Sequence, residues 1–311
     1  MVSESMFLFA NSMTLQETIP KIISCRAELF IDEAAAATEP EIFIPLHLRP
    51  FRMLCVGDPK QLPASVTSQR AAKFGLDQSL LERLICGCDN DHVMLDVQYR
   101  MKPQICAFPN SNFYNGELND GENVIRLDYK IKKSILNSDP YSFVQINGRE
   151  ARTGSGSYFN MDEARFVVNV VKHIRQTSCD KLWDSKDKLR VITFYSGQVR
   201  AIKDLLRPLG LGHVMVATVD SSQGCESDVV IVSFVRCQVK SSAVEGARTV
   251  KCRVGFLNDD RRINVALTRA KFKLICVGDG ENTLLKSDSP TVTSLAKNAM
   301  ERKLLVSQDV L

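Results

Sequence analysis

The segment at 257–271, LNDDRRINVALTRAK, carries three arginines that could neutralise the charge of a transferring phosphoryl group. Arg262 and Arg269 are seven positions apart, so two turns of a helix would bring them near one face, with Arg261 slightly to the side. Apolar residues at helical spacing would dock such a helix by its other side: Ile263, Ala266, Leu267 and Ala270. An arginine-rich helix is also typical of a solvated face, where Arg261 would only pair with an adjacent aspartate.

An acidic pair, Asp32 and Glu33, follows the apolar run at 29–31. A buried parallel strand that ends in two acids delivers both carboxylates to the sheet edge where nucleotide enzymes bind their ligands. There Asp32 would hold Mg²⁺ beside the substrate phosphates, and Glu33 would orient and deprotonate the attacking water. Two solvated acids at a strand end are the plainer alternative.

A second junction between a strand and a turn lies at 53–63, MLCVGDPKQLP. Its apolar run breaks at Gly-Asp-Pro, which is a strong turn signal. Gln61 follows this turn, where its amide could contact a γ-phosphate or position the attacking water. The alternative is an ordinary connection that Pro59 and Pro63 stiffen.

The hydrophobic pattern predicts the elements that must position these residues. Helix-like segments at 79–84 and 162–175 alternate with strand-like runs, which predicts an α/β protein with parallel sheets. The strand-like runs lie at 29–31, 53–56, 93–97, 189–194, 214–219, 229–235 and 273–277.

The segments between these runs predict a domain boundary and several connections. We expect the boundary near residue 93. Residues 115–160 contain Asn-Gly and other Gly-rich turn signals, which indicate loops with a hairpin. Residues 236–254 predict a surface excursion, and 297–305 predict a closing amphipathic helix.

The composition is that of a globular protein with ample material for cores. Of its 311 residues, 44% are hydrophobic and 24% are charged, which suits one or two domains. The net charge of +4 permits contact with a phosphate backbone without requiring it. The ten cysteines include no CxxC pair, which favours free thiols in a reducing compartment over zinc sites or disulfides. Because no signal peptide or span-length apolar run is evident, we expect an intracellular protein of the nucleus or cytoplasm with no membrane partner.

Five motifs occur in order along the chain: IDEAAAATEPE, VGDPKQLPASV, QYRMKPQICAFPNSNFYNGEL, TVDSSQGCESDVVIVSFVR and GFLNDDRRINVALTRAK. Together they resemble the ATP-site and coupling motifs of superfamily 1 helicases of the Upf1/Sen1 (DNA2/NAM7) group. The resemblance covers nearly the whole chain, because the stretch FLFANSMT at 7–14 is also similar to a segment of that group.

The resemblance implies two RecA-like domains with the parallel sheets of P-loop NTPases. Residues 1–92 would form part of the first domain, and 93–311 would form the complete second, helicase C-terminal domain. ATP and Mg²⁺ would bind between the domains, and hydrolysis would move single-stranded RNA or DNA in the 5′ to 3′ direction. The predicted function is therefore that of an ATP-dependent RNA/DNA helicase acting as part of a longer motor.

The resemblance also assigns catalytic roles. Asp32 would hold Mg²⁺ through water, Glu33 would activate the attacking water, and Gln61 would sense the γ-phosphate. Arg100 and Arg269 would reach that phosphate from the second domain as arginine fingers in cis.

Binding roles follow from the same resemblance. The ATP-binding residues would be Asp58, Tyr99, Gln223, Gly224 and Glu226, with Tyr99 stacked on the adenine. Nucleic-acid contacts are expected from Thr14, Thr193 and Tyr195, with Gln198 in the same segment. Tyr99 could instead be a half-buried tyrosine at a strand end, and Glu226 could simply cap the turn before a strand.

The chain departs from the pattern of the group in two ways. No GxxxxGK[ST] loop, which would cradle the phosphates, occurs in the 311 residues. We therefore expect either a piece of a longer helicase or a chain without its main phosphate grip. Ala36, Cys225 and Phe194 also replace a polar residue, a basic residue and a proline that are common in the group. The competing hypothesis is a non-catalytic nucleic-acid-binding remnant or scaffold, and a third is an inert product with an exposed strand edge.

Overall fold

The computed structural model describes residues 6–9, 27–88, 92–126, 139–177, 188–237 and 252–308. The chain forms two compact units, Met1–Met94 and Leu95–Leu311, and each has a parallel sheet of its own. Of the expected site residues, Thr14 lies outside the described residues.

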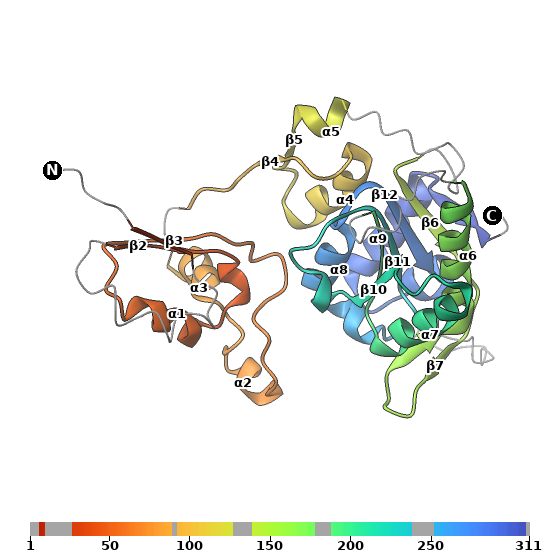
Figure 1. The fold of residues 1–311 in the computed structure, drawn as a ribbon, viewed down its shortest axis with the longest axis horizontal. Coiled ribbons are helices and arrows are strands. Elements are labelled where there is room, and N and C mark those ends of the chain that lie inside the picture. The colour runs from red at the N-terminus through yellow and green to blue at the C-terminus, as the bar shows by residue number, and fades with distance from the viewer. Residues whose placement is uncertain are drawn as a thin grey trace, which may run out of the picture. The chain divides into compact units, whose positions relative to one another are not determined.

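Unit 1 is organised by a three-stranded parallel sheet in the order β1-β2-β3 (Figure 1). The strands are β1 (Met6–Phe9), β2 (Ala27–Ile31) and β3 (Arg52–Cys55). Leu29 and Ile31 point from β2 into a small core that also contains Ala34, Ile42 and Leu80. The sheet therefore brings the carboxyl ends of β2 and β3 to one edge.

The helices of unit 1 begin at residues that cap them. They are α1 (Glu39–Leu46), α2 (Gln69–Lys73) and α3 (Leu80–Gly87). Thr38 starts α1 with a capping box in which its backbone N–H donates to the Glu41 carboxylate at 2.7 Å. Ser79 starts α3 by accepting the N–H of Glu82 at 3.1 Å. A two-bond contact from the Arg83 guanidinium to the Glu39 carboxylate, at 2.5 and 2.8 Å, joins α3 to α1.

Unit 2 is built on a six-stranded sheet in the order β10-β9-β11-β12-β6-β13, in which every paired strand is parallel. Because this order is not the order of the sequence, the connections must cross over the sheet. The strands are β6 (Tyr141–Gln145), β9 (Leu189–Thr193), β10 (Met215–Thr218), β11 (Ser227–Ser233), β12 (Ala270–Gly278) and β13 (Leu305–Ser307).

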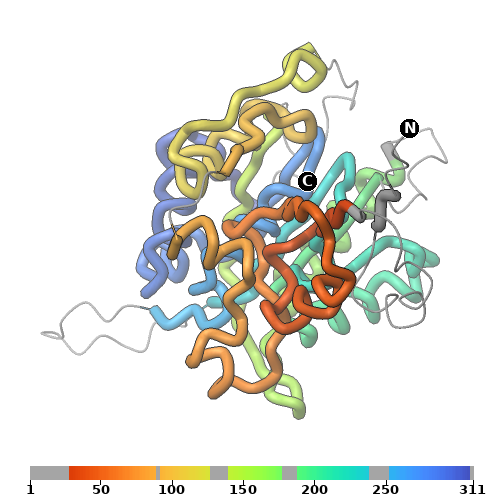
Figure 2. The backbone as a smooth tube through the Cα atoms, turned by 90° about the vertical axis from the view of Figure 1, so that its left-hand side faces the viewer, coloured from red at the N-terminus to blue at the C-terminus, as the bar shows by residue number. Residues whose placement is uncertain are grey.

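Both faces of this sheet are buried, because its central strands are apolar at successive positions. The helices α6 and α7 pack on one face, and α4, α8 and α9 group on the other (Figure 1). Although they are far apart in sequence, α4 and α9 lie beside each other in both views (Figures 1 and 2). The helices are α4 (Pro103–Phe113), α5 (Glu122–Arg126), α6 (Met161–Thr177), α7 (Ser196–Leu206), α8 (Asp260–Leu267) and α9 (Pro290–Glu301).

The α/β fold class with parallel sheets is confirmed, and most of the predicted strands are present. The strand predicted at 93–97 is wrong: only the two-residue strand β4 (Val97–Gln98) forms, paired with β5 (Asn119–Asp120). The structure adds strand β6 to a stretch in which we expected loops with a hairpin. The hairpin itself is present as β7 (Glu150–Arg152) and β8 (Tyr158–Asn160).

The chain end also differs from its prediction. Helix α9 ends at Glu301 and Leu305 begins the edge strand β13, so the helix predicted at 297–305 is present only over residues 297–301. Most of the excursion predicted at 236–254 lies outside the described residues. No described helix has both the length and the apolar character needed to cross a membrane. The cysteines within the described ranges are all free thiols.

Candidate nucleotide and nucleic-acid site

Two loops meet at the carboxyl edge of the sheet in unit 1. The strands β2 and β3 are neighbours, and the N–H of Val56 donates to the carbonyl of Ile31 at 2.8 Å. The N–H of Ala34 donates in turn to the carbonyl of Val56 at 2.8 Å. The acidic pair after β2 and the Gly-Asp-Pro turn after β3 are therefore joined through their backbones, which is the arrangement that binds ligands in open α/β sheets.

The acidic pair is exposed at this edge. Asp32 accepts the backbone N–H of Glu33 on Oδ1 at 2.9 Å, and no cationic side chain within the described residues pairs with Asp32. Glu33 has a φ of 52°, a left-handed backbone conformation that residues other than glycine rarely adopt. An exposed carboxylate without a cationic partner is a donor of the kind that Mg²⁺ binds directly or through water, so Asp32 fits the expected ion.

Gly57 allows the two loops to approach each other closely. A Cβ atom at this position would lie 2.8 Å from the backbone nitrogen of Ala35 and 3.0 Å from that of Ala34. Because both atoms belong to the backbone, a side chain at position 57 would push the two loops apart. The sequence signal was the Gly-Asp-Pro turn, but the close approach that requires glycine is visible only in the fold.

Asp58 holds Gln61 within the second loop. Its Oδ2 accepts the side-chain amide of Gln61 at 2.9 Å, and its Oδ1 accepts the N–H of Lys60 at 2.8 Å. The N–H of Gln61 also donates to the carbonyl of Asp58 at 3.0 Å. Asp58 was expected to bind ATP, and here its carboxylate orients the predicted γ-phosphate sensor.

A cationic cluster in unit 2 surrounds the carboxylate of Glu226. Arg100 contacts Oε2 through Nε at 2.9 Å, and Lys271 contacts Oε1 at 2.5 Å. A hydrogen bond from Lys271, joined by one from Arg100, holds the pKa of Glu226 below its ordinary value. Arg100 also donates to the carbonyl of Thr268 at 3.2 Å. Lys271 was missed as a site residue, although it follows Arg269 by two positions in the arginine-rich segment.

Arg269 lies outside the helix that was expected to carry it. Helix α8 ends at Leu267, so Arg262 and Arg269 do not share a helical face. The side chain of Arg269 is 1% exposed and donates to the carbonyl of Val265 at 3.1 Å and that of Cys225 at 3.4 Å. The guanidinium therefore ties the end of α8 to the chain segment before Glu226.

The other expected ATP-binding residues of unit 2 lie on turns. Gly224 has a φ of +70° between Gln223 and Cys225, which a glycine adopts without strain. Tyr99 is 67% exposed, and its ring lies against Gly121. An exposed ring on a short turn can stack on a planar ligand, whereas the half-buried alternative for Tyr99 is wrong.

The structure places Thr193 and Tyr195 in the interior of unit 2. Both side chains are buried, and the hydroxyl of Tyr195 donates to the carbonyl of Val254 at 3.0 Å. Gln198 is also buried, where its amide bonds to Asn160 and to Ser233 at 3.0 Å. Neither Thr193 nor Tyr195 is exposed to a nucleic-acid strand here, because β9 is an interior strand and residues 254–256 cover its end.

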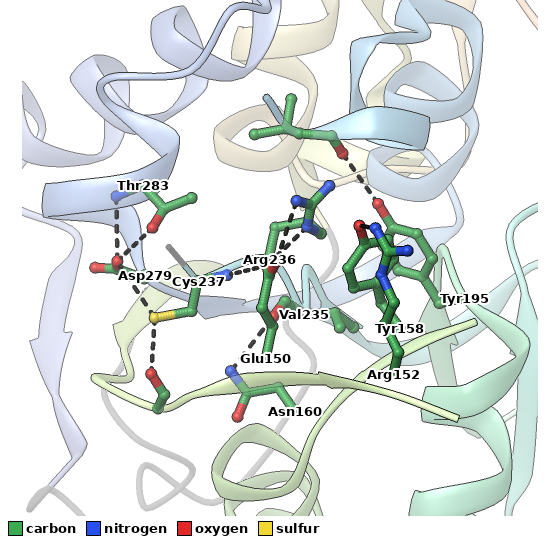
Figure 3. Close-up of polar contacts among 12 residues, drawn as sticks. Glu150, Arg152, Tyr158, Asn160, Tyr195, Val235, Arg236, Cys237, Asp279 and Thr283 are labelled. Atoms are coloured by element: carbon green, nitrogen blue, oxygen red, sulfur yellow. Dashed lines mark hydrogen bonds and ion pairs between the residues drawn. The ribbon is translucent and has the colours of Figure 1, made fainter. Parts of the chain in front are cut away.

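A polar network at the carboxyl ends of β9, β11 and β12 was not predicted at all (Figure 3). Arg236 bonds to the carboxylate of Glu150 at 2.8 and 3.2 Å, and its guanidinium carbon lies 4.3 Å from the ring centre of Tyr158. The guanidinium carbon of Arg152 lies 4.5 Å from the same ring. In the sequence, only the turn signals at 115–160 and the surface excursion expected at 236–254 pointed to this region.

Glu163 is a fully buried carboxyl group beneath this network. It accepts the hydroxyl of Ser233 at 2.7 Å and the N–H of Val235 at 2.9 Å, and burial raises its pKa to about 8. Val235 has a φ of 71°, which is strained for a β-branched residue. Its carbonyl accepts the side-chain amide of Asn160 at 3.3 Å. These bonds hold the turn that directs Arg236 toward Tyr158.

Comparison with known proteins identifies the class. An AAA domain matches residues 76–281, about two thirds of the chain, and a second AAA domain description matches residues 15–69. Helicase sen1 of Schizosaccharomyces pombe is 34% identical over 91% of this chain, and an uncharacterized ATP-dependent helicase of Methanocaldococcus jannaschii is 36% identical over 84%. A Regulator of nonsense transcripts 1 homolog of Drosophila melanogaster is 34% identical over 81%.

These matches show the family. The chain belongs to the AAA-domain family of Upf1/Sen1-like superfamily 1 helicases. It spans 16%, 36% and 20% of the lengths of the three relatives.

Proposed function

We propose that this chain is part of an ATP-dependent helicase motor that moves single-stranded RNA or DNA. The observation that carries the proposal is the joined carboxyl edge of β2 and β3 in unit 1. There the segment of Asp32 and Glu33 and the segment of Asp58 and Gln61 share backbone hydrogen bonds. Two acids and an amide at one edge of a parallel sheet suit the hydrolysis of a nucleoside triphosphate.

In this proposal each residue of unit 1 has a separate task. Asp32 would hold Mg²⁺, which would supply charge neutralisation for the triphosphate. Glu33 orients and deprotonates the attacking water. Gln61, held by Asp58, contacts the γ-phosphate. The strained backbone at Glu33 supports the assignment, because such strain is typical of functional sites.

Unit 2 supplies cationic and stacking groups. Arg100 and Arg269 stabilise the charge that develops on the transferring phosphoryl group, and Tyr99 stacks on the adenine. Gln223, Gly224 and Glu226 form the segment that links these cations to the nucleic-acid side. We assign unit 2 to the second RecA-like domain and unit 1 to the part of the first domain that carries the acidic pair.

The test begins by mapping the 5′ end of the transcript and expressing the protein that it encodes. ATP hydrolysis by that protein is then measured with and without single-stranded RNA and DNA, alongside binding of the same strands. The proposal expects hydrolysis that the strand stimulates. Strand binding without any hydrolysis would overturn it in favour of a non-catalytic nucleic-acid-binding module, the function expected of a protein that lacks the phosphate loop.

A further inference from the structure

The side chain of Gln98 holds the turn that carries Tyr99 and Arg100. Its carbonyl oxygen accepts the backbone N–H of Arg100 at 3.0 Å and that of Met101 at 2.8 Å. Its amide nitrogen donates to the carbonyl of Met101 at 2.7 Å and to Oδ1 of Asp120 at 2.5 Å. An amide has two N–H donors and a carbonyl that can accept twice, so every hydrogen-bonding position of this side chain is filled. The turn is therefore closed around one side chain.

Asp120 decides which way this amide points. A carboxylate can only accept, so the amide nitrogen of Gln98 must face it. In the reversed orientation the amide nitrogen would face the two N–H groups of the turn, donor against donor. The carboxylate is itself anchored, because Gln98 and Asp120 are paired residues of β4 and β5 and the buried Cys106 of α4 lies beside it. Burial, joined by this carboxylate, raises the pKa of the Cys106 thiol to about 12, so the thiol adds no negative charge there.

Gly121, the next residue along the chain, makes room for the ring of Tyr99. A Cβ atom at this position would lie 2.5 Å from Cδ1 and 2.6 Å from Cε1 of that ring. The N–H of Gly121 also donates to the carbonyl of Gln98 at 2.9 Å, and the side-chain amide of Asn123 donates to the carbonyl of Tyr99 at 2.9 Å. The ring of Tyr99 therefore lies on bare backbone on one side, and the rest of it is exposed.

We propose that Asp120 and Gly121 are positioning residues of the nucleotide site. Asp120 acts through Gln98 on the turn from which Arg100 extends, and Gly121 acts on the ring of Tyr99 alone. A misplacement of about 1 Å at a reacting group can cost about 10²-fold in rate, so a short strand behind the turn can control turnover. This inference rests on the proposed function and adds two residues that do not themselves touch the nucleotide.

The first test removes the acceptor that orients the amide, in the protein that the transcript encodes. Asp120→Ala should lower kcat for ATP hydrolysis by about 10- to 100-fold and raise KM for ATP about tenfold, because the turn carries both the arginine and the ring. Asp120→Asn keeps a side-chain carbonyl that can accept, so it should restore most of both constants. The matched control is Asn119→Ala, which loses a hydrogen bond to Asp96 from the same strand and should leave both constants unchanged.

The second test moves the ring of Tyr99 without touching the arginine. In Gly121→Ala the added methyl group displaces a side chain that can rotate away, so the melting temperature should stay near that of the wild type. KM for ATP should rise about tenfold, the value of one lost stacking contact, while kcat is kept. Gly121→Ala should add nothing to Tyr99→Ala, because both variants remove the same contact. A wild-type KM in Gly121→Ala would overturn the role of Gly121.

The two constants separate positioning from a loss of folded protein. A variant that merely unfolds has fewer active molecules, which lowers kcat per total protein and leaves KM unchanged, so a fall in kcat alone in Asp120→Ala would overturn the role of Asp120. Hydrogen exchange gives a readout that does not depend on hydrolysis. The amides of Arg100 and Met101, which donate to Gln98, should exchange faster in Asp120→Ala than in the wild type. Exchange as slow as in the wild type would also overturn this role.

The same experiments distinguish this inference from the proposed function. A wild-type protein that does not hydrolyse ATP would overturn the proposed function together with this inference. A wild-type protein that hydrolyses ATP, with both constants unchanged in Asp120→Ala and in Gly121→Ala, would overturn the positioning roles alone.

Discussion

Arg100 and Glu226 are 126 positions apart in the sequence and meet in an ion pair of 2.9 Å between Nε and Oε2. The pair joins the turn that carries Tyr99 to the segment of Gln223 and Gly224. Because Lys271 binds the other oxygen of the same carboxylate, Glu226 fixes two cations at once. The arginine proposed to act on the γ-phosphate is thus positioned by a carboxylate of the coupling segment.

Glu226→Gln should slow strand-stimulated ATP hydrolysis by about one to two orders of magnitude, because a misplaced cation loses most of its effect on a transition state. The free energy of unfolding should change by less than about 1 kcal/mol, since the pair is partly exposed. Steady-state hydrolysis and chemical denaturation measure the two effects. Glu122→Gln, on the exposed α5, is the control, and wild-type turnover in Glu226→Gln would contradict the positioning role.

Glu33→Gln should reduce ATP hydrolysis by about 10²- to 10⁴-fold, because an amide cannot accept the proton of the attacking water. Its side chain is exposed, so the folded state should be retained. Turnover and the circular dichroism melting curve are measured on the same preparation. If Glu33→Gln hydrolysed ATP as fast as the wild type, the assignment of Glu33 as the general base would be wrong.

Arg100→Ala and Arg269→Ala should differ in stability although both should impair hydrolysis. Arg269 is buried and donates to two carbonyl groups and to the hydroxyl of Thr268, so its loss should cost about 1–3 kcal/mol. Arg100 is partly exposed, and its loss should cost less than about 1 kcal/mol. Urea denaturation of both variants checks this order. Equal losses would mean that the buried contacts of Arg269 contribute little to the fold.

Gly57→Ala should destabilise unit 1 and weaken ATP hydrolysis together. The added methyl group would lie 2.8 Å from the backbone nitrogen of Ala35, and such overpacking typically costs about 1–3 kcal/mol. Hydrogen exchange of the amides of Ala34 and Val56, which hold the two loops together, would report the separation. The matched control is Gly154→Ala, because a Cβ at position 154 would have no atom within 4 Å, so this variant should be as stable as the wild type. Gly75 does not serve as a control, because its φ of +87° would strain an alanine. If these two amides exchanged in Gly57→Ala as slowly as in the wild type, the two loops would not need glycine at position 57 to stay together.

The stability of the chain should fall as the pH rises from about 5 to 8 because of Glu163. The pKa of this buried carboxyl group is about 8 in the folded chain, above its ordinary value of 4.5, so between these values only the folded state keeps the proton. Each pH unit in that window then costs up to about 1.4 kcal/mol, and the loss ends above the folded pKa. Denaturation of wild type and Glu163→Gln at pH 5, 6, 7 and 8 measures the difference. If the free energy of unfolding changed with pH equally in the two proteins, Glu163 would not be the cause of the pH dependence.

Much of the scaffold could be predicted because hydrophobic periodicity is local. The apolar runs that became β9 and β11, and the period of α6, are encoded within a few residues each. Strand β6 was missed because its run is short and lies among turn residues, so only its pairing with β12 and β13 identifies it. Likewise, the apolar run at 93–97 predicted a strand, but none of the described strands pairs with residues 93–95.

The sequence by itself determined which residues carry chemistry and the order of the five motifs, which is sufficient to identify the helicase group. Only the tertiary structure decided where those side chains lie. It buried Arg269 and Tyr195, gave Asp58 the task of orienting Gln61, and brought Arg100 and Lys271 to the carboxylate of Glu226. The physical reason is that a parallel sheet with crossover connections places distant segments at one edge, and no local pattern records that order.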